Sequence, residues 1–126
     1  INALGIRGTC LGGVILSGAF TQMMSLALKT WGLEEIKLKV TKNVLGLSTE
    51  KAISNGIVYG LEGAIVNIVN RIRSENKELA RAKVILTGGG ASDLKKILTN
   101  SGFQFLFKED LVLAGIETLF TEVKMN

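Results

Sequence analysis

The chain has 126 residues, of which 47% are apolar and 21% are charged, and its formal net charge is +4. This length favours one domain with a real core, and no apolar run reaches the roughly 18 unbroken residues that a membrane span needs. Cys10 is the single cysteine and histidine is absent, which excludes a disulfide framework, Ser-His-Asp and Cys-His catalysis, and histidine metal sites within this chain.

Lysine and arginine are scattered along the chain, without the dense basic stripe or exposed aromatic residues of a nucleic-acid surface. We therefore expect neither nucleic acid nor a membrane as a partner. A lone cysteine is typical of a reducing compartment, so the expected location is cytoplasmic.

The chain opens with two expected strands, Ile1–Leu4 and Cys10–Leu16, joined by a turn over residues 5–8. This pattern predicts a hairpin. Gly12 and Gly13 lie inside the second strand, where glycine often marks a bulge or a ligand lying against the backbone.

A helix is expected from about Ala19 to Trp31. Its apolar residues form a stripe at helical spacing, consisting of Phe20, Met23, Met24, Ala27 and Trp31. Leu26 and Leu28 fall outside this stripe, and a helix that is apolar on more than one side needs more than one partner. The sheet is one expected partner. A second subunit is the other, unless the helix is buried elsewhere in the same protein.

Gly32 is expected to end that helix, and the alternation over residues 35–40 predicts a short strand, followed by a loop over 41–47. The longest helix is expected from Ser48 or Thr49, either of which could cap it, to about Ser74. Its expected buried face consists of Ile53, Ile57, Leu61, Ala64, Ile65, Ile68 and Ile72. Each glycine at 56, 60 and 63 should lower helix stability by about 0.5–1 kcal/mol relative to alanine. Three such residues imply a close neighbour on that side of the helix, either another helix or a ligand.

Residues 83–93 read as a strand, a glycine-rich turn over Gly88–Gly90, and a helix for which Ser92 and Asp93 suit the start. Such a unit gathers free backbone N–H groups at a helix N-terminus, which favours anions and nucleotides. Folds with alternating strands and helices also use such turns for steric reasons alone.

A strand over Phe103–Phe107 and a helix beginning at Asp110 complete the expected elements. The last helix has an apolar face made of Val112, Ile116, Leu119, Phe120 and Val123. Strands that alternate with helices indicate an α/β fold with parallel pairing, in which ligands bind at the carboxyl ends of strands. The expected architecture is a mixed sheet with flanking helices, in which a hairpin is followed by alternating helices and strands.

Four segments together resemble the C-terminal half of type III pantothenate kinases, the family that includes proteins named Bvg accessory factors. These segments are Leu11–Gly18, Gly46–Gly60, Thr87–Gly89 and Asp110–Ile116. The resemblance implies a ribonuclease H-like, actin-like (ASKHA) fold, with residues 1–126 as the C-terminal domain of a longer two-domain kinase. It also implies transfer of the ATP γ-phosphate to pantothenate, the first step of coenzyme A synthesis. The implied cations are magnesium and a monovalent ion, either potassium or ammonium, and the implied assembly is a homodimer.

The resemblance also implies roles for single residues. Thr49 matches the threonine that contacts pantothenate, although it could also serve as a helix cap. Thr30 and Leu33 match positions that wall the pantothenate pocket of the partner subunit. The positions that border the nucleotide are Gly12, Gly13, Thr87, Gly88 and Gly89. Two departures stand out, since Ser17 replaces the usual proline and Leu47 the usual lysine.

The family's acidic motifs for phosphate, cation and base are missing from this chain, so we expect it to hold no catalytic residue and no metal ligand, and to be inactive alone. Two alternatives stay open. One is a non-catalytic, actin-like ligand-binding or regulatory protein of the accessory transcription factor type. The other is a structural module that self-associates through residues 20–31.

Overall fold

The computed structural model describes residues 1–31 and 36–125, and the chain divides into two compact units after Ala82. Helices and short strands are mixed along the described ranges, as the α/β class predicts. The described strands form two separate two-stranded sheets, one antiparallel and one parallel, rather than the single mixed sheet that the sequence predicts.

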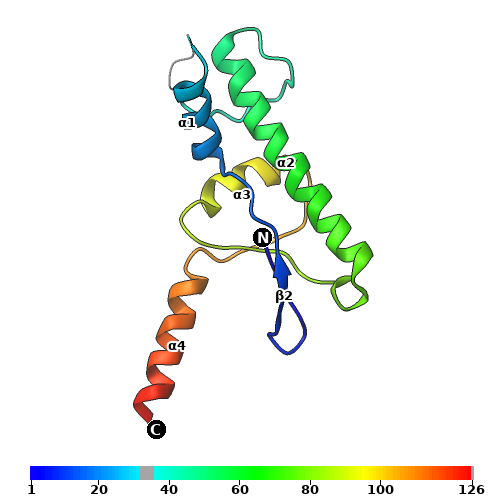
Figure 1. Ribbon diagram of the computed structural model, residues 1–126, viewed down its shortest axis with the longest axis vertical. Coiled ribbons are helices and arrows are strands. Elements are labelled where there is room, and N and C mark those ends of the chain that lie inside the picture. Colours follow the sequence, from blue (N-terminus) through cyan, green and yellow to red (C-terminus); the bar gives the residue numbers. More distant parts are fainter. Residues whose placement is uncertain (32–35, 126) are drawn as a thin grey trace. The chain divides into compact units, whose positions relative to one another are not determined.

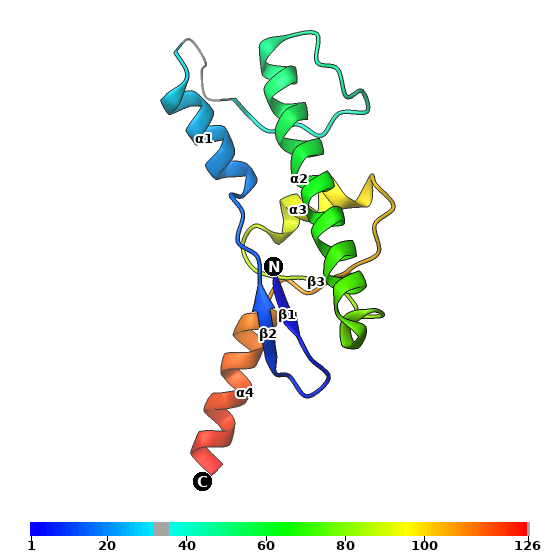
Figure 2. The ribbon, with the colours of Figure 1, turned by 45° about the vertical axis from the view of Figure 1, so that its right-hand side comes forward.

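The first unit begins with the predicted hairpin, in which β1 (Asn2–Leu4) pairs antiparallel with β2 (Cys10–Gly13) (Figure 2). The register shifts between Ala3 and Leu4, opposite a stretch in which Gly12 has a φ of +130°. The bulge expected from glycine inside this strand is therefore present. Strand β2 ends at Gly13, three residues before the predicted end, and beyond it Ile1 and Val14 still exchange two backbone hydrogen bonds of 2.8 Å.

Helix α1 (Ala19–Lys29) lies beside α2 (Thr49–Glu75) in the same unit (Figure 1). It ends two residues before the predicted Trp31, and the predicted terminator Gly32 falls outside the described residues. None of its side chains is fully buried, and Phe20 and Trp31 of the predicted stripe are 67% and 101% exposed. Within the described chain, α1 is thus covered on one side only.

The strand predicted over 35–40 is not observed in its described part, residues 36–40. The reason is visible at Lys39, whose backbone N–H donates to Ser54 Oγ at 2.8 Å and whose carbonyl accepts from the same hydroxyl at 2.7 Å. The backbone groups that would pair with a neighbouring strand are used by a helix side chain instead. The loop predicted over 41–47 is confirmed.

Helix α2 is the longest element and its bounds agree with the prediction to within a residue. A short 3-10 helix, η1 (Lys77–Leu79), follows it. The buried residues of α2 are Ser54, Asn55, Ile57, Val58, Leu61, Ile65 and Val69. Four of the predicted core residues, Ile53, Ala64, Ile68 and Ile72, are only half-buried. The buried face is thus rotated relative to the predicted one and includes two polar residues.

By length and composition alone, α2 is also the one described helix that could cross a membrane, because an 18-residue window in it has a mean hydropathy of 1.3. In the structure 39% of that window is buried, and the core helix of a soluble protein meets the same criterion.

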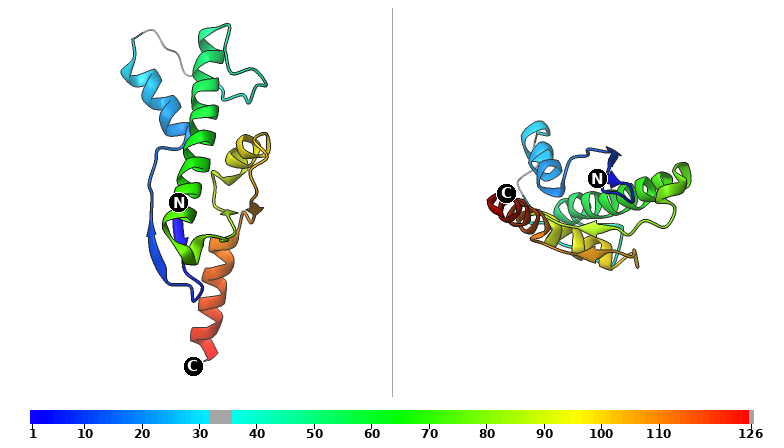
Figure 3. Two further views of the ribbon diagram at one scale, coloured as in Figure 1. Left: turned by 90° about the vertical axis from the view of Figure 1, so that its right-hand side faces the viewer. Right: turned by 90° about the horizontal axis from the view of Figure 1, so that it is seen from below.

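The second unit is a strand–helix–strand arrangement followed by a helix. Strands β3 (Ile85–Leu86) and β4 (Leu106–Phe107) pair in parallel, with α3 (Ala91–Thr99) between them in sequence. Both strands are shorter than predicted, but their parallel direction is confirmed. Figure 3 shows α4 (Leu111–Met125) leading away from α3.

The predicted apolar face of α4 is present but uncovered. Its five residues, Val112, Ile116, Leu119, Phe120 and Val123, are between 58% and 74% exposed. The predicted helical spacing is therefore confirmed, and within the described residues the face that it forms is largely uncovered.

We predict that Leu61→Ala lowers the free energy of unfolding by about 2–5 kcal/mol, because Leu61 is only 2% exposed and its truncation leaves a cavity. Urea unfolding measures the change. The matched control is Leu61→Met, which conserves volume and should cost less than about 1.5 kcal/mol. Equal losses in the two variants would contradict the prediction.

Candidate functional site

The segment that leads into α2 is held tightly against the first turn of that helix. A Cβ atom at Gly46 would overlap the backbone of Lys51 and Ala52, so only glycine fits there. Two residues later, Ser48 Oγ accepts a hydrogen bond from the Lys51 N–H at 3.3 Å, which identifies Ser48 as the N-cap.

The choice between Ser48 and Thr49 as the cap is thereby decided by the structure. Thr49 is the first residue of α2 and its side chain is exposed. Its hydroxyl has no hydrogen-bond partner among the described residues, so it remains available to a ligand.

Thr30 follows α1, and its backbone N–H donates to Leu26 O at 3.0 Å, which ends the helix. Its side chain is exposed, and no hydrogen bond joins it to Thr49 in the part of the chain that the structure describes. The second predicted wall residue, Leu33, lies outside the described residues. The structure therefore places Thr30 and Thr49 in the same unit, without a hydrogen bond between them in the described residues.

A polar network beneath the same segment was not predicted from the sequence. The buried side chains of Ser54 and Asn55 and the half-buried Tyr59 all bond to residues 39–44. Polar residues in a helix are exposed by default, and no pattern in the sequence marks these three as buried. At the rim, Lys39 Nζ lies 3.2 Å from Glu50 Oε1 in an exposed ion pair.

The two glycines of β2 are constrained mainly by the backbone. Gly12 has a φ of +130°, which L side chains rarely adopt. A Cβ atom at Gly13 would lie 2.6 Å from Ile1 O, so this position has no room for a side chain. Ser17 stands where the family usually has proline. Its carbonyl oxygen accepts a hydrogen bond from Gln22 Nε2 at 2.9 Å.

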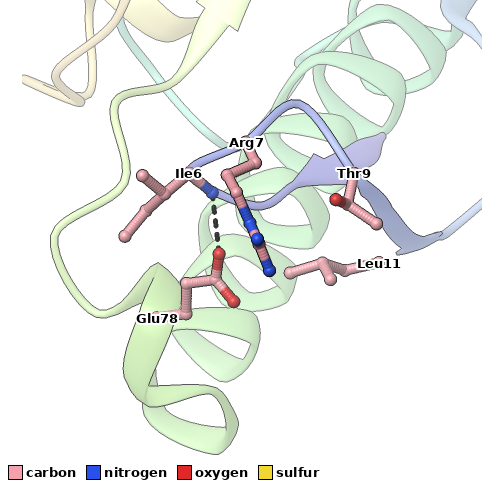
Figure 4. A pocket seen from close by; sticks show the side chains of 5 residues that line it. All are labelled: Ile6, Arg7, Thr9, Leu11 and Glu78. Atoms are coloured by element: carbon pink, nitrogen blue, oxygen red, sulfur yellow. Dashed lines mark hydrogen bonds between the residues drawn. The ribbon is translucent and has the colours of Figure 1, made fainter.

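A shallow pocket of about 430 Å³ in the first unit contains none of the predicted site residues. It is lined by Ile6, Arg7, Thr9, Leu11 and Glu78 (Figure 4). Glu78 Oε1 accepts from the Ile6 N–H at 2.7 Å and fills the space that a side chain on Gly5 would need. These contacts attach the hairpin turn to η1, which is a structural role.

The glycine-rich turn of the second unit is anchored at its first two residues. The Thr87 hydroxyl and the Gly88 N–H both donate to Glu109 O, each at 3.1 Å. Gly88 has a φ of +88°, so the turn requires glycine at this position. Helix α3 begins at Ala91 with Gly90 as its N-cap, which places Ser92 and Asp93 in the first turn rather than at the cap.

The end of this turn is open. A Cβ atom at Gly89 would meet nothing within 4 Å, and the N–H groups of Gly89 and Gly90 have no partner among the described residues. Exposed backbone donors at a helix start can receive an anionic group, so the turn fits a nucleotide lying against it. No group of three Asp, Glu or Cys side chains that could hold a metal ion is found in the described part of the chain.

Comparison with known proteins identifies the family. A family model described as type III pantothenate kinase matches residues 1–71. The chain belongs to this family. It is 34% identical over 119 residues to a type III pantothenate kinase of Pelagibacter ubique and 32% identical over 119 residues to one of Synechococcus elongatus, which in both cases covers 94% of the chain. It is also 34% identical, over 95% of its length, to a type III pantothenate kinase 1 of Francisella tularensis subsp. holarctica.

The chain spans about half the length of the curated relatives it matches, covering 46%, 47% and 45% of these three type III pantothenate kinases. The family model covers the hairpin, α1 and most of α2, including Thr49, and ends before the Thr87–Gly89 turn.

The glycines of α2 do not have the close neighbour that the sequence predicts. A Cβ atom at Gly56, Gly60 or Gly63 would meet nothing within 4 Å in the described chain, because these residues lie on the exposed side of the helix. Gly46, just before the helix, has a close neighbour instead, the backbone of Lys51 and Ala52.

We predict opposite effects of the same substitution at Gly46 and Gly63. Gly46→Ala should lower the free energy of unfolding by about 1–3 kcal/mol, because the new methyl group overlaps the α2 backbone. Gly63→Ala should raise it by about 0.5–1 kcal/mol, because alanine is the better helix former and the space is open. Thermal and urea unfolding of both variants check the prediction, and a neutral Gly46→Ala would contradict it.

Proposed function

We propose that this chain is part of a pantothenate kinase, which transfers the γ-phosphate of ATP to pantothenate in the first step of coenzyme A biosynthesis. The observation that carries the proposal is the match to relatives named type III pantothenate kinase along 94% of the chain. In this reaction a pantothenate hydroxyl oxygen bonds to the γ-phosphorus, the bond to the bridging oxygen breaks, and ADP leaves.

In this proposal the chain is the C-terminal, ribonuclease H-like domain of a two-domain protein with an actin-like (ASKHA) fold, and it works in the cytoplasm. The mixed α/β elements and the parallel β3–β4 pair are consistent with that fold. The remaining part of the longer protein supplies the base, the phosphate-binding turns and the sites for magnesium and for potassium or ammonium. The chain alone is then inactive.

Thr49 is the proposed pantothenate contact. Its exposed hydroxyl and the capping role of Ser48 support this assignment, because Thr49 is not needed to begin the helix. Gly12, Gly13, Thr87, Gly88 and Gly89 are the proposed border of the nucleotide. Within that border, the open Gly89 is the residue best suited to contact, whereas Thr87 holds the turn through Glu109.

The first test is an ATP-consumption assay of the full-length protein with and without pantothenate and potassium. Thr49→Ala should raise the KM for pantothenate about tenfold, because loss of one hydrogen bond to the substrate weakens binding by about that factor. Its thermal stability should be nearly unchanged. Thr49→Ser, which keeps the hydroxyl, should restore the KM.

Ser48→Ala is the matched control. It removes the cap and should lower the free energy of unfolding by about 1 kcal/mol, with a smaller effect on the KM for pantothenate. Absence of pantothenate-dependent turnover in a folded wild-type protein would reject the kinase proposal and favour the ligand-binding alternative.

We further propose that the kinase is a homodimer that uses α1, with Thr30 and Leu33 walling the partner's pantothenate pocket. The exposed apolar residues of α1, Phe20 and Leu28, support an interface on this helix, because a helix with open apolar faces gains stability when they are covered.

Leu28→Glu should therefore shift the full-length protein from dimer to monomer in light scattering, because Leu28 is 74% exposed in the single chain and a buried charge would oppose association. The matched control is Ser25→Glu, also on an exposed position of α1 but polar already. A monomeric wild type would reject the interface.

A further inference from the structure

One buried asparagine holds the segment that precedes the proposed substrate contact. Asn55 is only 3% exposed, and each of its polar atoms has a partner. Its Nδ2 donates to Asn43 O at 2.8 Å and to Val44 O at 2.9 Å, and its Oδ1 accepts from Thr41 Oγ1 at 2.5 Å.

A second side chain acts on the same segment one helical turn later. Tyr59 OH donates to Thr41 O at 2.8 Å. Because residues four apart lie on one face of a helix, Asn55 and Tyr59 present their polar groups together toward residues 41–44.

These bonds fix the path of the chain into the proposed acceptor site. Residues 41–44 are bonded to Asn55 and Tyr59, Gly46 is packed against Lys51 and Ala52, and Thr49 follows three residues later. The segment is therefore attached to α2 at two successive places before it reaches the exposed threonine.

We propose that Asn55 is a positioning residue for the acceptor substrate, which holds residues 41–47, and through them Thr49, in one conformation. The proposal rests on the proposed function for the identity of that substrate. Asn55 is not itself a ligand, because it is buried and its donors and acceptor are all used within the chain.

An apolar residue of similar size could not replace it. Among the described residues, the Val44 carbonyl would lose its partner, and the Asn43 carbonyl and the Thr41 hydroxyl would keep only the 3.0 Å bond that joins them to each other. A loop with fewer bonds to α2 rearranges more readily. Loss of Asn55 should thus change the local conformation and mobility of the loop more than it changes the rest of α2.

The experiment compares three variants of the full-length protein, Asn55→Ala, Tyr59→Phe and Val69→Ala. Val69 is buried on the same helix but 14 positions away, about 21 Å along its axis, so it controls for loss of stability alone. The two readouts are the rate at which trypsin cleaves the loop after the exposed Lys42, followed by mass spectrometry, and the KM values for pantothenate and for ATP.

We expect Asn55→Ala to speed cleavage after Lys42 at least tenfold and to raise the KM for pantothenate at least fivefold, with the KM for ATP within twofold of wild type. Tyr59→Phe removes one bond and should change both readouts in the same direction but less. Val69→Ala should leave cleavage after Lys42 and both KM values unchanged.

Unchanged cleavage in Asn55→Ala and Tyr59→Phe would overturn the proposal, and so would faster cleavage with an unchanged KM for pantothenate. If Asn55→Ala does not fold, Tyr59→Phe decides by the same two readouts. A wild-type protein without pantothenate-dependent turnover would instead reject the proposed function, and the cleavage readout, which needs no substrate, would still report whether Asn55 holds the loop.

Discussion

The first unit depends on the attachment of neighbouring segments to helix α2. Three polar side chains, Ser54, Asn55 and Tyr59, fix the backbone of residues 39–44, while Gly46 and Ser48 join the same helix at its first turn. Helix α1 and η1 contact α2 as well. Removal of α2 would therefore leave the loop, the cap and α1 without the surface that orders them.

Sequence patterns predicted those elements that depend on residues close together in the chain. Glycine inside a strand predicted the bulge at Gly12, and a strand followed by glycines predicted the turn at Gly88. Strands that alternate with helices predicted the parallel pairing of β3 with β4. The alternating residues 36–40 show the limit of such signals. Alternation shows which side chains would share a face, but it does not show whether a partner strand exists. In the structure the N–H and carbonyl of Lys39 bond to the Ser54 hydroxyl instead.

The candidate site also shows what sequence patterns can and cannot predict. Ser48 and Thr49 both suit a helix cap by residue type, and only the geometry of the first turn separates the residue that caps from the one whose hydroxyl has no hydrogen-bond partner in the described residues. The burial of Asn55 was beyond the sequence, because two of its three partners are backbone carbonyls that any residue could provide, and no pattern pairs it with the third, the Thr41 hydroxyl. The exposed faces of α1 and α4 have clear apolar spacing, yet spacing does not reveal what covers them.

The loop before α2 is held largely by hydrogen bonds to its backbone. Its conformation therefore depends little on which side chains it carries. Asn55 and Tyr59 bond to carbonyls of residues 41, 43 and 44, while the side chain of Leu47 is 95% exposed and takes no part. Leucine at 47 in place of the family's usual lysine therefore alters the charge beside Thr49 without altering the path of the chain. In this chain, the main-chain path and the surface chemistry of the site are therefore set by different residues.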